Sequence, residues 1–217
     1  MNTITHDRDL LRLEPVLFLG GGCASRTLIA GGDGVLSGST FTSPGSDFAQ
    51  AALAAGMVLC TWTDAPEEPT AVEIVSVDSA TQLTVSVLRE SPDSEPVAPS
   101  AGSGLGFFVR SYRPEIRQAA DQLAHMLSRS GETLRQDPPT FCDAAVLRET
   151  IALGALATIF SARSSNGGRT DSAGIKAERY RREWLAARTR LRVAVDTDGD
   201  GLPDETRTLG HVTLRRI

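Results

Sequence analysis

The sequence predicts an α+β protein with an N-terminal β module, a three-helix bundle and a C-terminal β-hairpin or extended tail. Between residues 16 and 112, short strand-like runs alternate with clusters of glycine, proline, serine and aspartate, as in all-β modules. After Pro114, apolar residues instead recur every three or four positions, as they do on one face of a helix. Strand-like segments return after residue 191, so the chain is expected to change its class of secondary structure twice.

The β module is predicted from several short runs, two of which show clear alternation. In "TAVEIVSV" (70–77) and "QLTVSVLR" (82–89), apolar and polar residues alternate, as expected for strands with one buried face. Residues 77–82 are expected to join these two runs as a short hairpin. Residues 46–56 are expected to form one or two helical turns. The remaining strand-like runs cover residues 16–19, 27–30, 34–43, 56–63 and 105–112.

Three helices are predicted in the second half of the chain. The first has Pro114 in its first turn, where proline is well tolerated, and runs to about residue 128. The second covers residues 141–163, and its small residues predict close packing in the middle of a bundle. The third covers residues 174–192, and its apolar stripe consists of Tyr180, Trp184, Ala187 and Leu191.

The pattern also predicts where the domains begin and end. Residues 91–104 are rich in proline, serine and glycine, and we expect a mobile loop there. The expected domains are a polar N-terminal lead (1–15), a β-barrel-like module (16–112), a helical bundle (113–193), and an acidic turn followed by a C-terminal strand or tail (194–217).

Composition argues against several classes of protein. The net charge of −5 and the pI near 5.3 disfavour general binding to nucleic acid or to an anionic membrane. The most apolar run, residues 151–162, is too short to span a bilayer, and the N-terminus does not resemble a signal peptide. The three cysteines are widely spaced and suggest no disulfide framework, which favours a reducing compartment.

No catalytic pattern stands out, so we expect that the protein is not an enzyme. The glycines of "FLGGGCAS" (18–25) lack the lysine of a phosphate-binding P-loop and are better interpreted as a turn. His6, His125 and His211 are far apart in the sequence. Cys142 is more easily explained as a small buried residue than as a nucleophile.

Residues 196–204 form a candidate metal site because they match the front half of a calcium-binding loop. Such loops place oxygen ligands at positions 1, 3, 5, 7 and 9 and a bidentate glutamate at position 12. Position 12 is Arg207 here, where a calcium loop has its glutamate. A solvated Asp-Gly turn between two strands is therefore the favoured alternative. Apart from this possible calcium ion, no cofactor is expected. The candidate calcium ligands are Asp196, Asp198, Asp200, the carbonyl of Leu202, and Asp204.

The third predicted helix and the C-terminal tail are candidate surfaces for a partner. Lys176 is the only lysine, and arginine is favoured at polar protein contacts, although a GC-rich genome would also enrich arginine. Glu178 and Glu183 lie among the basic residues, which favours a solvated or partner-contacting face over direct contact with DNA. The candidate partner-contacting residues are Arg179, Arg182, Arg188, Arg190, Val212, Leu214, Arg215, Arg216 and Ile217.

Three stretches resemble the head–tail adaptor proteins of tailed bacteriophages, prophages and gene-transfer agents, which are also called connector or head-completion proteins. Residues 39–88, with "DFAQAALAAGM" and "EIVSVDSATQLTV", look like the strands of a small phage β-barrel. Residues 107–127, "FFVRSYRPEIRQAADQLAHML", look like the passage from that barrel into the first bundle helix. Residues 177–201 look like the passage from a helix into an acidic turn near the C-terminus.

This resemblance implies a structural virion protein at the neck, assembled in the host cytoplasm. The expected state is a homo-oligomeric ring of roughly twelve copies with a heterologous interface. The expected partners are the portal protein, a tail or stopper protein and, without sequence readout, packaged DNA; no membrane is expected. Two alternatives remain: a tail-completion or stopper protein of the same neck region, or a calcium-stabilised extracellular binding module.

Overall fold

The computed structural model places the chain in two compact units. One unit consists of residues 6–112 and is called the barrel unit; the other consists of residues 1–5 and 113–217 and is called the helical unit. The barrel unit is therefore an insertion in the sequence of the helical unit. The α+β class is confirmed. The described residues are 4–19, 26–63, 69–127, 140–141, 144–164, 171–196 and 202–209.

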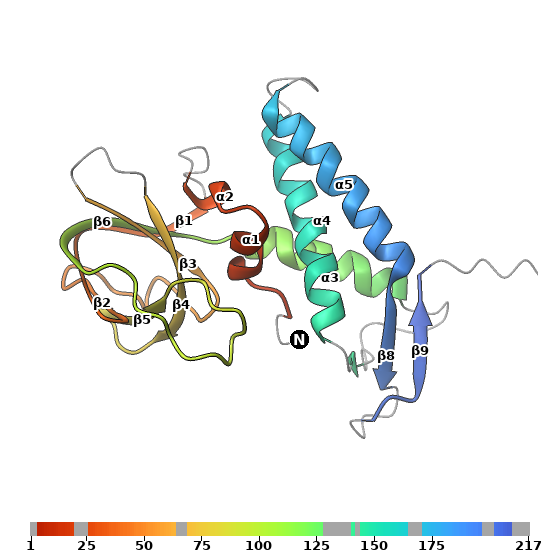
Figure 1. The fold of residues 1–217 in the computed structure, drawn as a ribbon, viewed down its shortest axis with the longest axis horizontal. Coiled ribbons are helices and arrows are strands. Elements are labelled where there is room, and N and C mark those ends of the chain that lie inside the picture. The colour runs from red at the N-terminus through yellow and green to blue at the C-terminus, as the bar shows by residue number, and fades with distance from the viewer. Residues whose placement is uncertain are drawn as a thin grey trace, which may run out of the picture. The chain divides into compact units, whose positions relative to one another are not determined.

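A closed barrel of six strands forms the barrel unit, in agreement with the predicted β-barrel-like module (Figure 1). Neighbouring strands are antiparallel, in the order β1-β2-β5-β4-β3-β6. The predicted hairpin joins β4 to β5, with Val77 opposite Leu83. The strands are β1 (Thr27–Ser37), β2 (Thr40–Thr42), β3 (Val58–Trp62), β4 (Thr70–Val77), β5 (Gln82–Ser86) and β6 (Gly102–Arg110).

Three phenylalanine rings occupy the centre of the barrel. Phe41 and Phe107 meet edge to face with centroids 5.1 Å apart, and Phe48 lies 6.2 Å and 6.3 Å from these two rings. All three side chains are fully buried. Gly34 of β1 makes room for them, because a Cβ atom there would lie 2.8 Å from the Phe41 ring and 3.0 Å from the carbonyl oxygen of Leu105. The barrel interior is therefore a packed core.

The predictions for the N-terminal residues are wrong. Residues 1–15 are not merely a polar lead, because α1 (Asp7–Leu13) buries Leu10 and Leu11. The predicted strand over residues 16–19 is the short helix α2 (Val16–Leu19), which buries Leu17 and Phe18. A carboxylate oxygen of Asp7 accepts a hydrogen bond from the backbone N–H of Tyr112 at 2.7 Å. The N-terminal and C-terminal ends of the barrel unit are thereby joined.

The predictions for two loops agree with the structure in part. Residues 46–56 contain a single helical turn, in which the N–H of Ala51 donates to the carbonyl of Asp47 at 3.0 Å, and no longer helix. The loop predicted over residues 91–104 is fixed at its base, since the N–H of Val87 donates to the carbonyl of Val97 at 2.9 Å. Its final residues, 102–104, already belong to β6. Hydrogen bonds within the loop, which the sequence pattern does not reveal, account for this difference.

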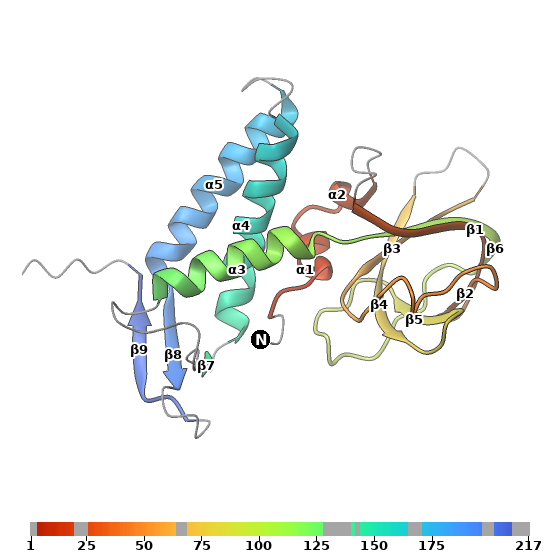
Figure 2. The ribbon, with the colours of Figure 1, turned by 180° about the vertical axis from the view of Figure 1, so that it is seen from behind.

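In the helical unit, α4 packs against both α3 and α5 (Figure 2). The helices are α3 (Arg113–Leu127), α4 (Ala144–Ser164) and α5 (Ser172–Arg190). The carboxylate of Asp171 caps α5 by accepting a hydrogen bond from the N–H of Gly174 at 2.5 Å. Gly154 lies where both neighbouring helices approach α4, in agreement with the predicted close packing: a Cβ atom there would be 2.9 Å from Nε1 of Trp184 and 3.2 Å from Cβ of Ala119.

A small antiparallel sheet completes the helical unit. It contains β7 (Thr140–Phe141), β8 (Arg192–Asp196) and β9 (Glu205–Thr208), in the order β7-β8-β9. Val193 and Val195 of β8 are fully buried. Strand β9 ends at Thr208, so strand structure is seen in part of the segment predicted as an acidic turn and a C-terminal strand or tail (194–217), and residues 210–217 lie outside the described part.

Asp33 gives the barrel unit a pH-dependent contribution to stability. The hydroxyl of Ser43 and the N–H of Gly45 donate to its carboxylate, at 2.5 Å and 2.7 Å, and hold the pKa of Asp33 below its usual value. A lowered folded-state pKa stabilises the fold above the unfolded-state pKa, about 3.9, and the contribution is lost as pH falls through the folded-state pKa. Asp33→Asn should therefore destabilise the barrel unit at neutral pH, with a difference from wild type that shrinks in acid.

The two tryptophans make this measurement specific to one unit, because Trp62 lies in the barrel unit and Trp184 in the helical unit. Urea unfolding followed by Trp62 fluorescence, in a Trp184→Phe background, gives the stability of the barrel unit at each pH. Asp93→Asn is the control, since Asp93 is an exposed carboxylate of the same unit. An Asp33→Asn effect that is equal at neutral and acidic pH would contradict the assignment.

Candidate functional site

The structure describes three of the five candidate calcium ligands. Asp196 ends β8 and is buried at 3 % exposure, whereas Leu202 and Asp204 lie on the exposed segment before β9. Asp198 and Asp200 lie outside the described residues. The N–H of Asp204 donates to the carbonyl of Val195 at 2.9 Å, so this segment returns directly into the β8–β9 ladder. Within the described residues, no group of three or more His, Cys, Asp or Glu side chains is placed to hold a metal ion.

Arg207, at the twelfth position of the candidate loop, points into the helical unit. Its guanidinium donates from Nη1 to the carbonyl of Leu127 at 3.1 Å and from Nε to Glu205 at 2.6 Å. Leu127 is the last residue of α3, where a cation is favoured by the helix dipole. Arg207 therefore caps α3 and puts a positive charge where a calcium loop needs a carboxylate, which argues against calcium binding.

Helix α5 carries an exposed arginine-rich surface, which we call the α5 outer face and define as Ile175, Glu178, Arg179, Arg182, Leu185 and Ala186. These residues recur at three- and four-residue spacing opposite the buried Ala177 and Tyr180. Ile175 and Leu185 are 62 % and 42 % exposed, so the face offers aliphatic area beside its charged residues. Arg179 pairs with Glu183 at 2.9 Å, and Arg182 is exposed.

The other two predicted arginines of α5 have local roles. Arg188 is half-buried, and its guanidinium carbon lies 4.6 Å from the ring centroid of Trp184. Arg190 is exposed and donates from Nε to the carbonyl of Ala186 at 3.2 Å, near the end of the helix. Arg179 and Arg182 thus share the outer face, while Arg188 does not. Val212, Leu214, Arg215, Arg216 and Ile217 lie outside the described residues.

Basic side chains also lie over the aromatic rings between α4 and α5. Phe160 and Tyr180 stack with centroids 5.7 Å apart and an interplanar angle of 14°. Arg163 and Lys176 approach the Phe160 ring at 5.6 Å and 5.3 Å, and Arg179 lies 5.3 Å from the Tyr180 ring. Both rings are buried and the cations lie over them, so the positive charge of α5 extends onto the end of α4.

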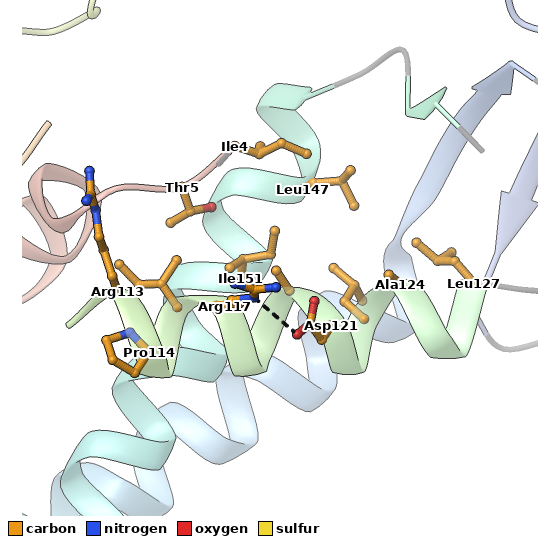
Figure 3. A pocket seen from close by; sticks show the side chains of 13 residues that line it. Ile4, Thr5, Arg113, Pro114, Arg117, Asp121, Ala124, Leu127, Leu147 and Ile151 are labelled. Atoms are coloured by element: carbon orange, nitrogen blue, oxygen red, sulfur yellow. Dashed lines mark ion pairs between the residues drawn. The ribbon is translucent and has the colours of Figure 1, made fainter. Parts of the chain in front are cut away.

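A groove of about 700 Å³ lies within the helical unit, between α3, the first half of α4 and the N-terminal residues Ile4 and Thr5 (Figure 3). The hydroxyl of Thr5 donates to the carbonyl of Arg148 at 3.3 Å, and Nε of Arg148 donates to the carbonyl of Ile4 at 3.2 Å. Arg117 and Asp121 pair across 3.8 Å at its rim. Its remaining lining is mainly aliphatic, which suits apolar contacts.

The sequence did not single out the charged loop that follows β5. Residues 87–97, which we call the barrel loop, carry the exposed carboxylates Glu90, Asp93 and Glu95. Nη1 of Arg89 donates to the carbonyl of Ser94 at 2.6 Å, and the N–H of Val97 donates to Oγ of Ser86 at 2.8 Å. The acidic residues in "ESPDSE" are a usable signal, but their proline- and serine-rich surroundings favoured a mobile loop.

Cys60 is the one cysteine within the described residues, and it is not suited to nucleophilic chemistry. Its thiol is fully buried and lies 3.6 Å from the carbonyl oxygen of Phe18. Burial raises the pKa of Cys60 to about 12, so the reactive thiolate is scarce at neutral pH.

Among the described residues, no helix has both the length and the apolar character needed to cross a membrane. Comparison with protein-family models, curated proteins and solved structures gave no match, and the function is therefore argued from the sequence and the structure.

Proposed function

We propose that this chain is a structural virion protein, a head–tail adaptor that forms a ring between the portal and the tail of a tailed bacteriophage. In this proposal α3, α4 and α5 act as a three-helix bundle, and the segment after Asp196 acts as a hairpin and tail that reach a partner. The resemblance supplies the place in the virion. A stopper or tail-completion protein of the same neck region is the alternative, and location within a particle separates the two.

The α5 outer face is the observation that carries this proposal. It combines two exposed aliphatic side chains with Arg179 and Arg182 on a regular helix. Arginine is enriched in protein interfaces, where its planar group pairs with carboxylates while its stem covers apolar surface. Such a surface is suited to holding a protein partner.

The proposal predicts that the purified protein assembles into rings, alone or when the portal protein is added. Mass photometry and negative-stain microscopy measure this directly, and a protein that stays monomeric in both conditions would contradict it. The role of the tail should be tested by deleting residues 210–217 only. A deletion from residue 206 would also remove Arg207, which caps α3. Particles should fail to join heads to tails when residues 210–217 are absent.

The calcium-stabilised module is tested separately, by comparing the melting temperature with calcium and with chelator. The buried position of Arg207 leads us to expect equal melting temperatures. A rise in calcium would instead support the extracellular module. Contact of the α5 arginines with packaged DNA stays a prediction.

A further inference from the structure

We propose that copies of this chain associate head to tail, with the barrel loop of one copy packed against the α5 outer face of the next. This inference rests on the proposed function, because it names the surfaces through which the ring would form. The occupant of the α5 outer face is therefore a second copy of the chain.

The charges of the two units support this pairing. The barrel unit contains thirteen acidic and five basic residues, whereas the helical unit contains fourteen acidic and seventeen basic residues. Helix α5 alone carries six basic and two acidic side chains. Contact between a barrel unit and a helical unit is thus electrostatically favoured, and contact between two barrel units is disfavoured.

The two surfaces also match in composition. The barrel loop exposes Glu90, Asp93 and Glu95 beside Val87 and Val97, which are 46 % and 56 % exposed. The α5 outer face exposes Arg179 and Arg182 beside Ile175 and Leu185. Each surface offers aliphatic area with charges around it. The barrel loop is acidic, whereas the α5 outer face has a small positive excess, because Arg179 and Arg182 outnumber Glu178 and Arg179 also pairs with Glu183. Burying these aliphatic side chains against each other would supply affinity, and the ion pairs would supply orientation.

Both surfaces are formed before any partner arrives. The barrel loop is closed by the Val87–Val97 hydrogen bond and held from inside by Arg89, and the α5 outer face is part of a continuous helix. Association therefore needs little additional ordering of the backbone, which is a major cost of binding by flexible loops. Arg12 brings one positive charge to one end of the barrel loop, where it donates to the carbonyl of Glu90 at 3.2 Å. The three carboxylates of the loop outnumber this single positive charge.

The identity of the two contacting surfaces determines which kind of assembly this contact can form. The barrel loop and the α5 outer face are different surfaces of one chain, so the interface is heterologous and each copy has one of each to offer. Repeating it gives a closed ring if the rotation closes and a filament if it does not. A two-fold dimer would need the same surface on both copies.

Charge reversal on one surface at a time tests the proposal. The first variant, Arg179→Glu/Arg182→Glu, makes the α5 outer face acidic; the second, Glu90→Arg/Asp93→Arg/Glu95→Arg, makes the barrel loop basic. Each variant alone places like charges in contact, and we expect its self-association to weaken by on the order of 100-fold. All five positions are exposed, so circular dichroism should be unchanged. Arg117→Glu, at a residue 84 % exposed on α3, is the control and should assemble normally.

Mixing the two variant proteins, or combining their substitutions in one chain, gives the decisive test. An equal mixture should assemble again, with the two variants alternating. The basic barrel loop of the second variant then faces the acidic α5 outer face of the first, and the two unchanged surfaces face each other. A single chain carrying all five substitutions should also assemble. Mass photometry measures the oligomers, with portal protein present if the wild type needs it.

The outcomes separate this inference from the proposed function. If wild-type rings form and either single-surface variant forms them equally well, the pairing is wrong and the adaptor proposal stands. Failure of both the mixture and the combined chain to assemble would also overturn the pairing. Filaments in place of rings would support the pairing and contradict a closed ring. A wild type that stays monomeric with portal contradicts the proposed function and the inference together.

Discussion

Glu73→Gln is expected to destabilise the barrel unit by about 3–5 kcal/mol, because it removes the buried carboxylate that two buried guanidinium groups share. Glu73 lies on β4 and is fully buried. Nε of Arg8 lies 3.0 Å from one of its carboxylate oxygens, and Nε of Arg89 donates to the other. The two arginine side chains are only 6 % and 8 % exposed, so water can compensate little for the lost charge.

This network also connects elements that are distant in the sequence. Arg8 belongs to α1, and its Nη2 donates to the carbonyl of Arg89 at 2.6 Å, while Arg89 holds the barrel loop through Ser94. Removing the charge of Glu73 should therefore loosen α1 and the barrel loop together. Hydrogen exchange should show faster exchange in both segments.

The stability loss is measured by urea unfolding, followed by Trp62 fluorescence in the Trp184→Phe background. Glu90→Gln is the matched control, because Glu90 is exposed and its neutralisation should change stability by less than about 1 kcal/mol. Arg8→Met/Glu73→Gln should cost less than the sum of its single substitutions, since one of the two uncompensated charges is gone. A loss for Glu73→Gln as small as that of Glu90→Gln would show that the network contributes little.

Glu73 and the neighbouring strand β5 illustrate which features the sequence alone can predict and which it cannot. Alternation placed Leu83, Val85 and Val87 on one face; Leu83 and Val85 are fully buried in the barrel, whereas Val87 is exposed. It could not predict a buried ion network, because the partners of Glu73 lie 65 and 16 residues away, which follows from their numbers. A charged residue within an alternating run is ordinarily assigned to the solvent face. Burial of Glu73 depends on tertiary contacts that local pattern does not contain.

The missed α2 helix and the candidate sites have similar explanations. A run of four apolar residues such as 16–19 is compatible with a strand or a buried helical turn, and periodicity alone cannot distinguish them. The sequence did identify Arg179 and Arg182, because a run of arginines is visible without any structure. It also identified Arg207 as the break in the calcium pattern. That Arg207 caps α3 requires knowing that Leu127 lies beside β9, 80 residues away along the chain.

Gly154→Val is expected to destabilise the helical unit by about 1–3 kcal/mol, because the new side chain would overlap two neighbouring helices. In an exposed helix, replacing glycine ordinarily stabilises by up to about 1 kcal/mol, since glycine is a poor helix former. At Gly154 the collision should dominate. A Cβ atom would already lie 2.9 Å from Nε1 of Trp184, and Ala119 of α3 closes the other side at 3.2 Å.

The indole of Trp184 has little freedom to move aside, because Arg188 lies over its ring. Unfolding should be followed by Trp184 fluorescence in a Trp62→Phe background, which reports on the helical unit alone. Ala162→Val on the exposed part of α4 is the matched control, and it should cost only the difference in helix propensity, about 0.6 kcal/mol. Trp184→Ala should reduce the additional cost of Gly154→Val, measured by circular dichroism, since it removes the group that valine meets. If Gly154→Val costs no more than Ala162→Val, then α4 and α5 are not packed as closely at Gly154 as the structure places them.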